Sequence, residues 1–156
     1  MSHLKIISGG QTGVDRGALD AALAANTPCG GWCPKQRRAE DGRIPDRYPL
    51  LEMGSSDYRQ RTLRNVLDSD GTLVIYFGEL EGGTKLTVFY CRQQHKPCKL
   101  LNANEISTDR SADLVDDFII AQGIKVLNVA GPRASSEPQA YDYTFRMITL
   151  FLLRHA

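Results

Sequence analysis

The stretch SGGQTGVDRG at residues 8–17 gathers glycines, two small polar side chains, an acid and a base within one turn. Glycine permits a tight turn and lets a ligand approach the backbone, and a following helix offers free N–H groups and a positive dipole end. The stretch therefore predicts an anion-binding loop, although the same glycines could serve chain reversal alone. Its candidate ligand-binding residues are Gly9, Gly10, Gln11, Thr12, Gly13, Asp15 and Arg16.

The last two of these residues have alternative roles. Asp15 could accept hydrogen bonds from hydroxyl or amino groups of a ligand, or it could favour the start of a helix electrostatically. Arg16 could contact the ligand or pair with Asp15, with Asp20 or with acids of the connection that follows the second strand.

A second glycine-rich turn, GELEGGTKLT at residues 78–87, follows the apolar run TLVIYF. Its spacing approaches that of a P-loop, but Thr84 separates the last glycine from Lys85, so the sequence excludes a P-loop kinase or ATPase. The candidate ligand-binding residues are Gly82, Gly83, Thr84 and Thr87. Thr84 could offer its hydroxyl to a ligand or simply cap the next helix.

A third turn, GPRAS at residues 131–135, follows KVLNVA and precedes a helix announced by SEP. Arg133 carries a fork of donors that suits a phosphate or a carboxylate. A single surface arginine is usually just solvated, but three such turns at one end of a sheet favour a shared ligand site. Gly131, Arg133 and Ser135 are its candidate residues.

The connection at residues 33–56 is long for a segment with little predicted regular structure. Basic residues alternate in it with acids, and five apolar residues could hold it against the body: Trp32, Ile44, Tyr48, Leu50 and Leu51. We expect a wall over the ligand crevice to which Lys35, Arg37 and Arg38 contribute charge. The alternative is a solvated charged loop.

These turns must be positioned by alternating strands and helices. Apolar runs predict strands at residues 4–8, 29–32, 72–77, 97–101 and 125–130. Helical spacing predicts helices at residues 13–25, 57–69, 84–95, 111–122 and 137–154. The pattern indicates a Rossmann-like, doubly wound α/β fold with a mainly parallel sheet and helices on both faces. In a 2-1-3-4-5 strand order, the third turn would lie two strands from the switch point, roughly 10 Å away.

Length and charge exclude several classes of protein. The chain of 156 residues fits one domain, and its formal net charge of +1 gives no reason to expect nucleic-acid or membrane binding. No signal peptide or membrane span is evident, which predicts a cytoplasmic protein. The four cysteines have no zinc-site or thioredoxin spacing, so we expect buried free thiols and no metal site.

Four motifs in order resemble the proposed molybdenum-cofactor carrier branch of the SLOG superfamily, which is named for the lonely-guy phosphoribohydrolases and the bacterial DNA-processing proteins. They are SGGQTGVDRGALDAAL, GWCPKQRRAEDGRIPDRYPLLE, EGGTKLT and NVAGPRASSEP, and the resemblance covers nearly the whole chain. It implies a Rossmann-like fold that binds nucleotide-like or other phosphorylated ligands. Carrier relatives are credited with holding molybdenum cofactor, a pterin that bears a phosphate.

One position departs from the hydrolase relatives. Their PGGxGTxxE turn carries a catalytic glutamate, and the alignment with Gly83 and Thr84 places Thr87 at that position. The departure favours a binding protein, a carrier or a nucleotide sensor. A phosphoribohydrolase-like enzyme remains the alternative, in which Asp15, Glu79 or Glu81 would replace the missing carboxylate.

The last predicted helix is apolar around most of its circumference. One face carries Tyr141, Phe145, Ile148, Phe151 and Leu152, and the other carries Tyr143, Met147, Leu150 and Leu153. A single sheet face covers only one stripe of a helix, so we expect a homo-oligomer in which this helix is a main contact.

Overall fold

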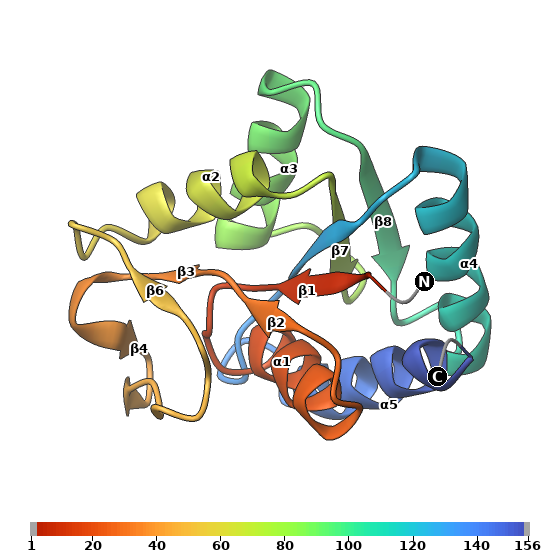
Figure 1. The fold of residues 1–156 in the computed structure, drawn as a ribbon, viewed down its shortest axis with the longest axis horizontal. Coiled ribbons are helices and arrows are strands. Elements are labelled where there is room, and N and C mark those ends of the chain that lie inside the picture. The colour runs from red at the N-terminus through yellow and green to blue at the C-terminus, as the bar shows by residue number, and fades with distance from the viewer. Residues whose placement is uncertain (1–2, 155–156) are drawn as a thin grey trace.

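A computed structural model describes residues 3–154 and contains a five-stranded sheet in the order β2-β1-β9-β7-β8 (Figure 1). All four neighbouring pairs run parallel. The strands are β1 (Lys5–Ile7), β2 (Cys29–Gly30), β7 (Gly71–Tyr76), β8 (Cys98–Asn102) and β9 (Val126–Ala130). The doubly wound α/β architecture predicted from the sequence is confirmed.

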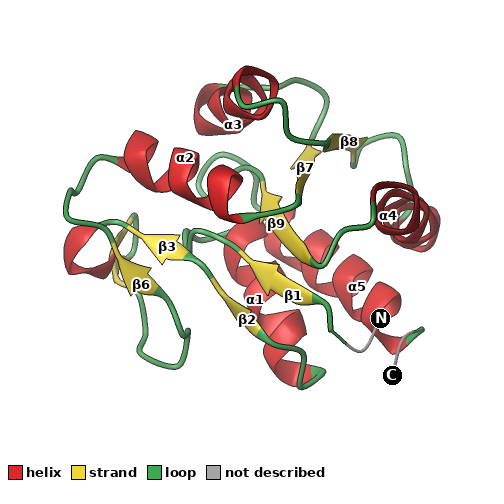
Figure 2. Ribbon diagram, turned by 45° about the horizontal axis from the view of Figure 1, so that its top comes forward, coloured by secondary structure: helices red, strands yellow, loops and turns green. Residues whose placement is uncertain are grey.

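Helices form the two outer layers of the molecule (Figure 2). One face of the sheet is covered by α2 (Tyr58–Asp68) and α3 (Gly82–Gln93), and the other by α1 (Val14–Ala24), α4 (Thr108–Gln122) and α5 (Ala140–Leu153). The predicted helices agree with these bounds to within a few residues at each end. Within residues 3–154, no helix combines the length and the apolar character that crossing a membrane demands.

Side chains cap some helices but not those that follow the first two glycine-rich turns. Asp57 accepts from the Arg59 N–H at 2.9 Å and caps α2, and Ser107 accepts from the Arg110 N–H at 3.2 Å and caps α4. Helices α1 and α3 begin without a side-chain cap. Their first N–H groups must therefore be satisfied in another way.

The strand order differs from the expected 2-1-3-4-5 order, because the last strand β9 lies between β1 and β7. In the register, Ile6 of β1 pairs with Leu127 and Leu73 of β7 pairs with Val129. The right-handed crossover rule sets the handedness of each strand–helix–strand connection, whether the next strand is adjacent in the sheet or one position further away. The rule therefore did not decide the strand order. The buried interior of β9 takes the centre, and the half-exposed β8 takes the edge. The third turn therefore lies beside the first one.

The predicted strand at residues 29–32 is interrupted at Gly31, where the chain leaves the main sheet. Gly31 has φ +125°, and a Cβ atom there would lie 2.2 Å from the Ser8 carbonyl oxygen. Beyond this point the connection contains more regular structure than we expected. It forms β3 (Trp32–Cys33), a short 3₁₀ helix (Lys35–Arg37), β4 (Arg38–Ala39), β5 (Gly42–Arg43) and β6 (Leu51–Glu52).

Residues 33–56, which we call the lid segment, pack on α1 through a small core of their own. Its buried members include Ile44, Tyr48 and Leu50, which pack with Leu19. Of the two other predicted anchors, Trp32 is half-buried and Leu51 is 60% exposed.

Among the four free cysteines, Cys33 and Cys91 are buried and Cys29 and Cys98 are half-buried.

Helix α5 lies between α1 and α4, which cover more of it than the sequence suggested (Figure 2). Met147 is fully buried, and Tyr143 and Leu150 pack against the core. The expectation of a bare second face was therefore wrong for Met147, because neighbouring helices cover what the sheet does not, whereas Tyr143 and Leu150 are only partly buried. Leu153 remains 63% exposed.

Candidate functional site

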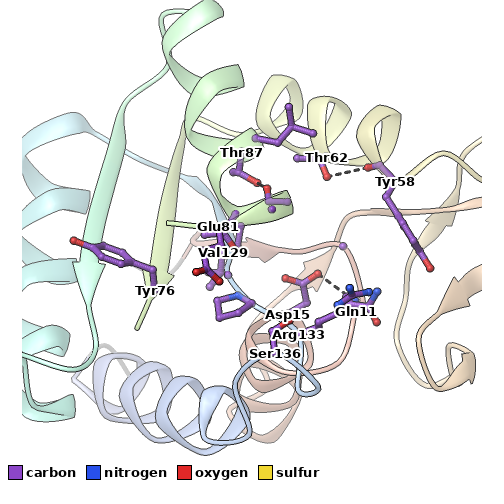
Figure 3. Close-up of a pocket in the computed structure, with 18 of the residues that line it drawn as sticks. Gln11, Asp15, Tyr58, Thr62, Tyr76, Glu81, Thr87, Val129, Arg133 and Ser136 are labelled. Carbon is purple, nitrogen blue, oxygen red and sulfur yellow. Dashed lines mark hydrogen bonds between the residues drawn. The ribbon is translucent and has the colours of Figure 1, made fainter. Parts of the chain in front are cut away.

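A cavity of about 580 Å³ opens at the carboxyl ends of β1, β7 and β9, beside α2 and α3 (Figure 3). This is the edge of an open α/β sheet where ligands bind. All three glycine-rich turns contribute to its lining. The candidate residues that line it are Gly9, Gln11, Asp15, Gly82, Gly83, Thr84, Thr87, Gly131 and Arg133. Those that do not are Gly10, Thr12, Gly13, Arg16, Lys35, Arg37, Arg38 and Ser135.

The turn before α3 is open to the cavity. The N–H groups of Thr84 and Lys85 both donate to the Glu81 carbonyl, at 3.1 and 3.2 Å. Within residues 3–154, no acceptor is found for the N–H groups of Gly82 and Gly83, and a Cβ atom on either residue would meet nothing within 4 Å. A ligand anion can therefore reach these N–H groups and the positive end of the α3 dipole.

The first turn, in contrast, is filled by side chains. The Gln11 N–H donates to the Asp15 carboxyl at 3.2 Å, and the Thr12 N–H donates to the Gln11 side-chain oxygen at 3.1 Å. Gly10 has φ +81°, and a Cβ atom there would lie 2.6 Å from the Leu50 side chain. The N–H groups of Gln11 and Thr12 are thus used within the turn itself, and the backbone cradle expected there stays a prediction.

The third turn brings backbone and charge to the cavity beside the first turn. Gly131 allows close packing, because a Cβ atom there would lie 2.6 Å from both the Ile75 carbonyl oxygen and the Val14 side chain. Arg133 lines the cavity with a half-exposed side chain, and its Nε lies 3.8 Å from a Glu40 carboxylate oxygen.

A buried acid and a buried base lie next to each other at the cavity wall. Arg61 donates from Nη1 to the Gly9 carbonyl at 2.7 Å, and the same atom lies 4.0 Å from Oδ2 of Asp15. Burial raises the pKa of Asp15, whereas the Arg61 charge and the hydrogen bond from the Gln11 N–H oppose the rise. Figure 3 shows the Asp15 carboxyl directed toward Gln11.

Sequence reasoning missed the contribution of α2. This helix supplies Tyr58, Arg59, Arg61, Thr62 and Asn65 to the cavity lining. Asn65 is buried and accepts from the Trp32 N–H at 2.8 Å. The sequence did contain a signal for this contribution. Arg61 and Asn65 are four residues apart and so lie on one face of the helix, and a helix that covers a sheet is expected to carry apolar residues on the face that it buries.

The strands add aromatic and amide groups that the sequence did not single out. Tyr76, Phe77 and Asn128 line the cavity. Asn128 donates to the Thr72 hydroxyl at 3.2 Å. The Phe77 ring packs on Tyr143 of α5 at a centroid distance of 5.8 Å, so Tyr58 is the aromatic residue of the lining that lies beside charged groups, with the Arg61 guanidinium 5.5 Å from its ring centroid.

The lid segment does not line this cavity, so the expected wall over the crevice is wrong for residues 33–56. Arg37 is buried inside the segment, where its guanidinium donates to the carbonyls of Ile44, Pro45, Tyr48 and Leu50 at 2.7 to 3.3 Å. These bonds explain Arg37 as a structural residue.

The other two basic residues of the lid segment are exposed. Lys35 has its side chain in solvent, away from the cavity lining. The Arg38 guanidinium lies 5.8 Å from the ring centroid of Tyr58. Tyr58 lines the cavity, but Arg38 itself does not. Arg16 pairs with a lid acid, one of its expected alternatives: it binds Asp41 through two hydrogen bonds of 2.5 and 2.7 Å.

Carboxylates line the cavity, but residue 87, where the hydrolase relatives would carry glutamate, is a threonine. The Thr87 hydroxyl donates to the Gly83 carbonyl at 2.9 Å. Glu79, Glu81 and Glu137 line the cavity along with Asp15. Within the part of the chain that the structure describes, no group of three or more His, Cys, Asp or Glu side chains is placed to hold a metal ion.

The cavity thus combines open helix N–H groups, the guanidiniums of Arg59, Arg61 and Arg133, aromatic rings and several carboxylates. N–H groups and guanidiniums bind oxyanions, rings pack on flat heterocycles, and carboxylates accept from amino and hydroxyl groups.

The chain is similar to known proteins over nearly its full length. Residues 6–152 match the family described as the circularly permutated YpsA SLOG family. A crystal structure from Syntrophus aciditrophicus, described as a "putative molybdenum carrier protein", is 50% identical, with a TM-score of 0.94 over 97% of this chain and 96% of that chain. None of the curated proteins matches the chain. The match over residues 6–152 and the 50% identity, together with the shared fold, establish that this chain belongs to the circularly permutated YpsA family of SLOG proteins.

Proposed function

We propose that the protein binds a phosphorylated ligand of the nucleotide or pterin class and acts as a molybdenum-cofactor carrier or a nucleotide sensor. The observation that carries the proposal is the turn before α3, where Gly82 and Gly83 line the cavity and a Cβ atom on either residue would meet nothing within 4 Å. A phosphoryl group at this position would also lie in a cavity that contains the guanidiniums of Arg61 and Arg133.

The remaining lining supports a ligand with a flat, nitrogen-rich ring. Tyr58 offers a ring surface, and Asp15 offers a buried acceptor for ring N–H or amino groups. The cavity volume of about 580 Å³ lies in the range of small-molecule sites. The relative named as a molybdenum carrier supports molybdenum cofactor as the cargo, since that cofactor is a pterin with a phosphate.

Native mass spectrometry of freshly purified protein tests the ligand class directly. We expect a co-purified mass that carries phosphorus and a purine or pterin chromophore.

Calorimetry with AMP and GMP then tests the site. The change Arg133→Ala should weaken binding about tenfold or more, because a charge-assisted hydrogen bond contributes about 1.5 to 3 kcal/mol.

A matched control is Arg154→Ala, which removes the same charge at the far end of α5, where Arg154 pairs with Asp113 at 2.5 Å. This variant should bind the nucleotides as the unchanged protein does. Equal affinity in Arg133→Ala would remove Arg133 from the site. The absence of both a co-purified ligand and nucleotide binding would contradict the proposed function.

The buried acid favours a second candidate function, hydrolysis of the N-glycosidic bond of a nucleotide. Asp15 lines the cavity, and its raised pKa is typical of carboxyl groups that exchange protons during catalysis. Glu81 is the other carboxyl group in position. Incubation with nucleoside monophosphates should release free base, and Asp15→Asn should abolish the release. Binding without any release of base would reject this candidate.

We also propose that the protein is a cytoplasmic homo-oligomer, at least a dimer. The exposed Leu153 and the half-buried Leu150 of α5 are the groups that support a contact through this helix. Changing both residues to Glu should dissociate the oligomer. Light scattering that gives a concentration-independent mass near 17.3 kDa for the unchanged protein would contradict it.

A further inference from the structure

The tip of the β4–β5 hairpin places a carboxylate between the first and third turns. The Glu40 carboxylate accepts from the Thr12 hydroxyl, from the Ser135 N–H at 3.2 Å and from the Ser135 hydroxyl at 2.5 Å. Arg133 Nε lies 3.8 Å from it. We call this group of donors, Thr12, Arg133 and Ser135, the Glu40 site.

The donors of the Glu40 site bind the Glu40 carboxylate in the way that a protein binds an oxyanion. Two hydroxyls, one backbone N–H and one guanidinium converge on the two oxygens, and these are the donors that also bind phosphate. The Ala134 N–H donates to the Thr12 oxygen at 3.1 Å, which leaves the Thr12 proton for the carboxylate. Hydrogen bonds from Ser135 and Thr12 lower the pKa of Glu40, so the site favours a negative charge.

The Glu40 site lies at the rim of the large cavity. Gln11 and Arg133 line that cavity, whereas the next residue of each turn, Thr12 and Ala134, lines a second cavity of about 380 Å³. The hairpin tip is therefore bound on the divide between the two cavities. The Glu40 site therefore adjoins the large cavity through Gln11 and Arg133.

We propose that the Glu40 site is an oxyanion subsite, in which a phosphoryl group of the ligand displaces the Glu40 carboxylate. The inference rests on the proposed function for the body of the ligand, which occupies the large cavity. The subsite itself binds inorganic phosphate. A tethered carboxylate competes at an effective concentration in the millimolar range or above, so its removal strengthens anion binding.

Titration of ¹⁵N-labelled protein with orthophosphate tests the subsite and the cavity separately. The Ser135 N–H signal follows the Glu40 site, and the Gly82 and Gly83 signals follow the turn before α3. In Glu40→Ala, phosphate should bind at Ser135 at least about tenfold more tightly than in the unchanged protein. Its affinity at Gly82 and Gly83 should change less than about twofold.

Two further variants keep the test decisive. Glu40→Gln removes the charge and keeps the shape, so it should show an intermediate gain at Ser135. Asp46→Ala removes the same charge from the lid segment, where Asp46 pairs with Arg43 at 2.6 Å, and should show no gain.

The outcomes distinguish the subsite from the proposed function. A Ser135 signal that phosphate leaves unmoved in both Glu40 variants, while Gly82 and Gly83 respond, would overturn the subsite alone. A response at Ser135 without one at the two glycines would support the subsite and contradict the proposed phosphate position at α3. An equal gain in Asp46→Ala would reveal a general charge effect and would also overturn the subsite.

Discussion

The first turn and the turn before α3 are both rich in glycine, and both connect a strand of the sheet to a helix, yet their environments are opposite. At the first turn, Asp15 and the Gln11 side chain occupy backbone N–H groups, and the lid segment packs on Gly10. At the second turn, a Cβ atom on Gly82 or Gly83 would meet nothing within 4 Å. Glycine serves close packing in one turn and access to the backbone in the other.

This difference shows that a glycine-rich turn is by itself an ambiguous signal. Glycine is required wherever φ is positive or two segments approach closely, and a ligand is only one of the groups that can approach. The neighbouring side chains decide which purpose applies. Substitutions with the same side chain at the two turns should therefore affect different properties.

The largest expected effect is on stability, from Gly10→Val. At φ +81° a β-branched side chain is strained, and it would also collide with Leu50 and Ile44 at 2.6 and 2.9 Å. We expect the free energy of unfolding to fall by about 3 kcal/mol or more. Urea denaturation measures the change. A loss of nucleotide affinity at unchanged stability would mean that Gly10 faces a ligand after all.

The matching change at the open turn, Gly83→Val, should affect binding. A Cβ atom at this position meets nothing within 4 Å, so we expect the free energy of unfolding to change by less than about 1 kcal/mol. It would stand between a phosphoryl group and the N–H groups, and the affinity for AMP should fall about tenfold. Calorimetry that gives an unchanged affinity would place the phosphate elsewhere.

The smallest effect concerns the acid that helps to close the first turn. Because burial raises the pKa of Asp15, its contribution to stability is fully present below the ordinary pKa of 3.8 and is lost as the pH rises through the raised value. Asp15→Asn should therefore raise Tm by a few degrees near pH 8, and the gain should vanish below about pH 4.

Thermal unfolding over a series of pH values measures this effect. Asp117→Asn, at an exposed position of α4, is the control and should give no such pH-dependent gain. A gain in Asp15→Asn that persists at low pH would show that ionisation of Asp15 is not its cause.

Much of the fold could be predicted from local patterns. Apolar runs such as TLVIYF indicate strands through neighbouring residues alone, whereas the Ser107 cap was overlooked and the helix α4 was predicted to begin at residue 111 instead of Thr108. The strand order could not be predicted in this way, because it depends on which strand is covered on both faces. The lid segment was hard to assign for the same reason, since its buried Arg37 is explained only by the carbonyls that surround it.

Part of the candidate site was likewise visible in the sequence. The three turns and Arg133 were found because strand ends of one direction meet at one sheet edge. Arg61 was missed, because its place in the cavity depends on the rotation of α2 over the sheet. Glu40 was missed because it reaches Thr12 and Ser135 only when the hairpin folds back on two turns that are distant in sequence.

The sequence alone determined the alternation of strands and helices, the three glycine-rich turns and the family, since these depend on residues that are close along the chain. Only the tertiary structure decided which turn is open. That outcome depends on side chains from distant segments, such as Leu50 against Gly10, and on the insertion of β9 between β1 and β7. Packing between distant segments is governed by shape and burial, and no local pattern in the sequence records it.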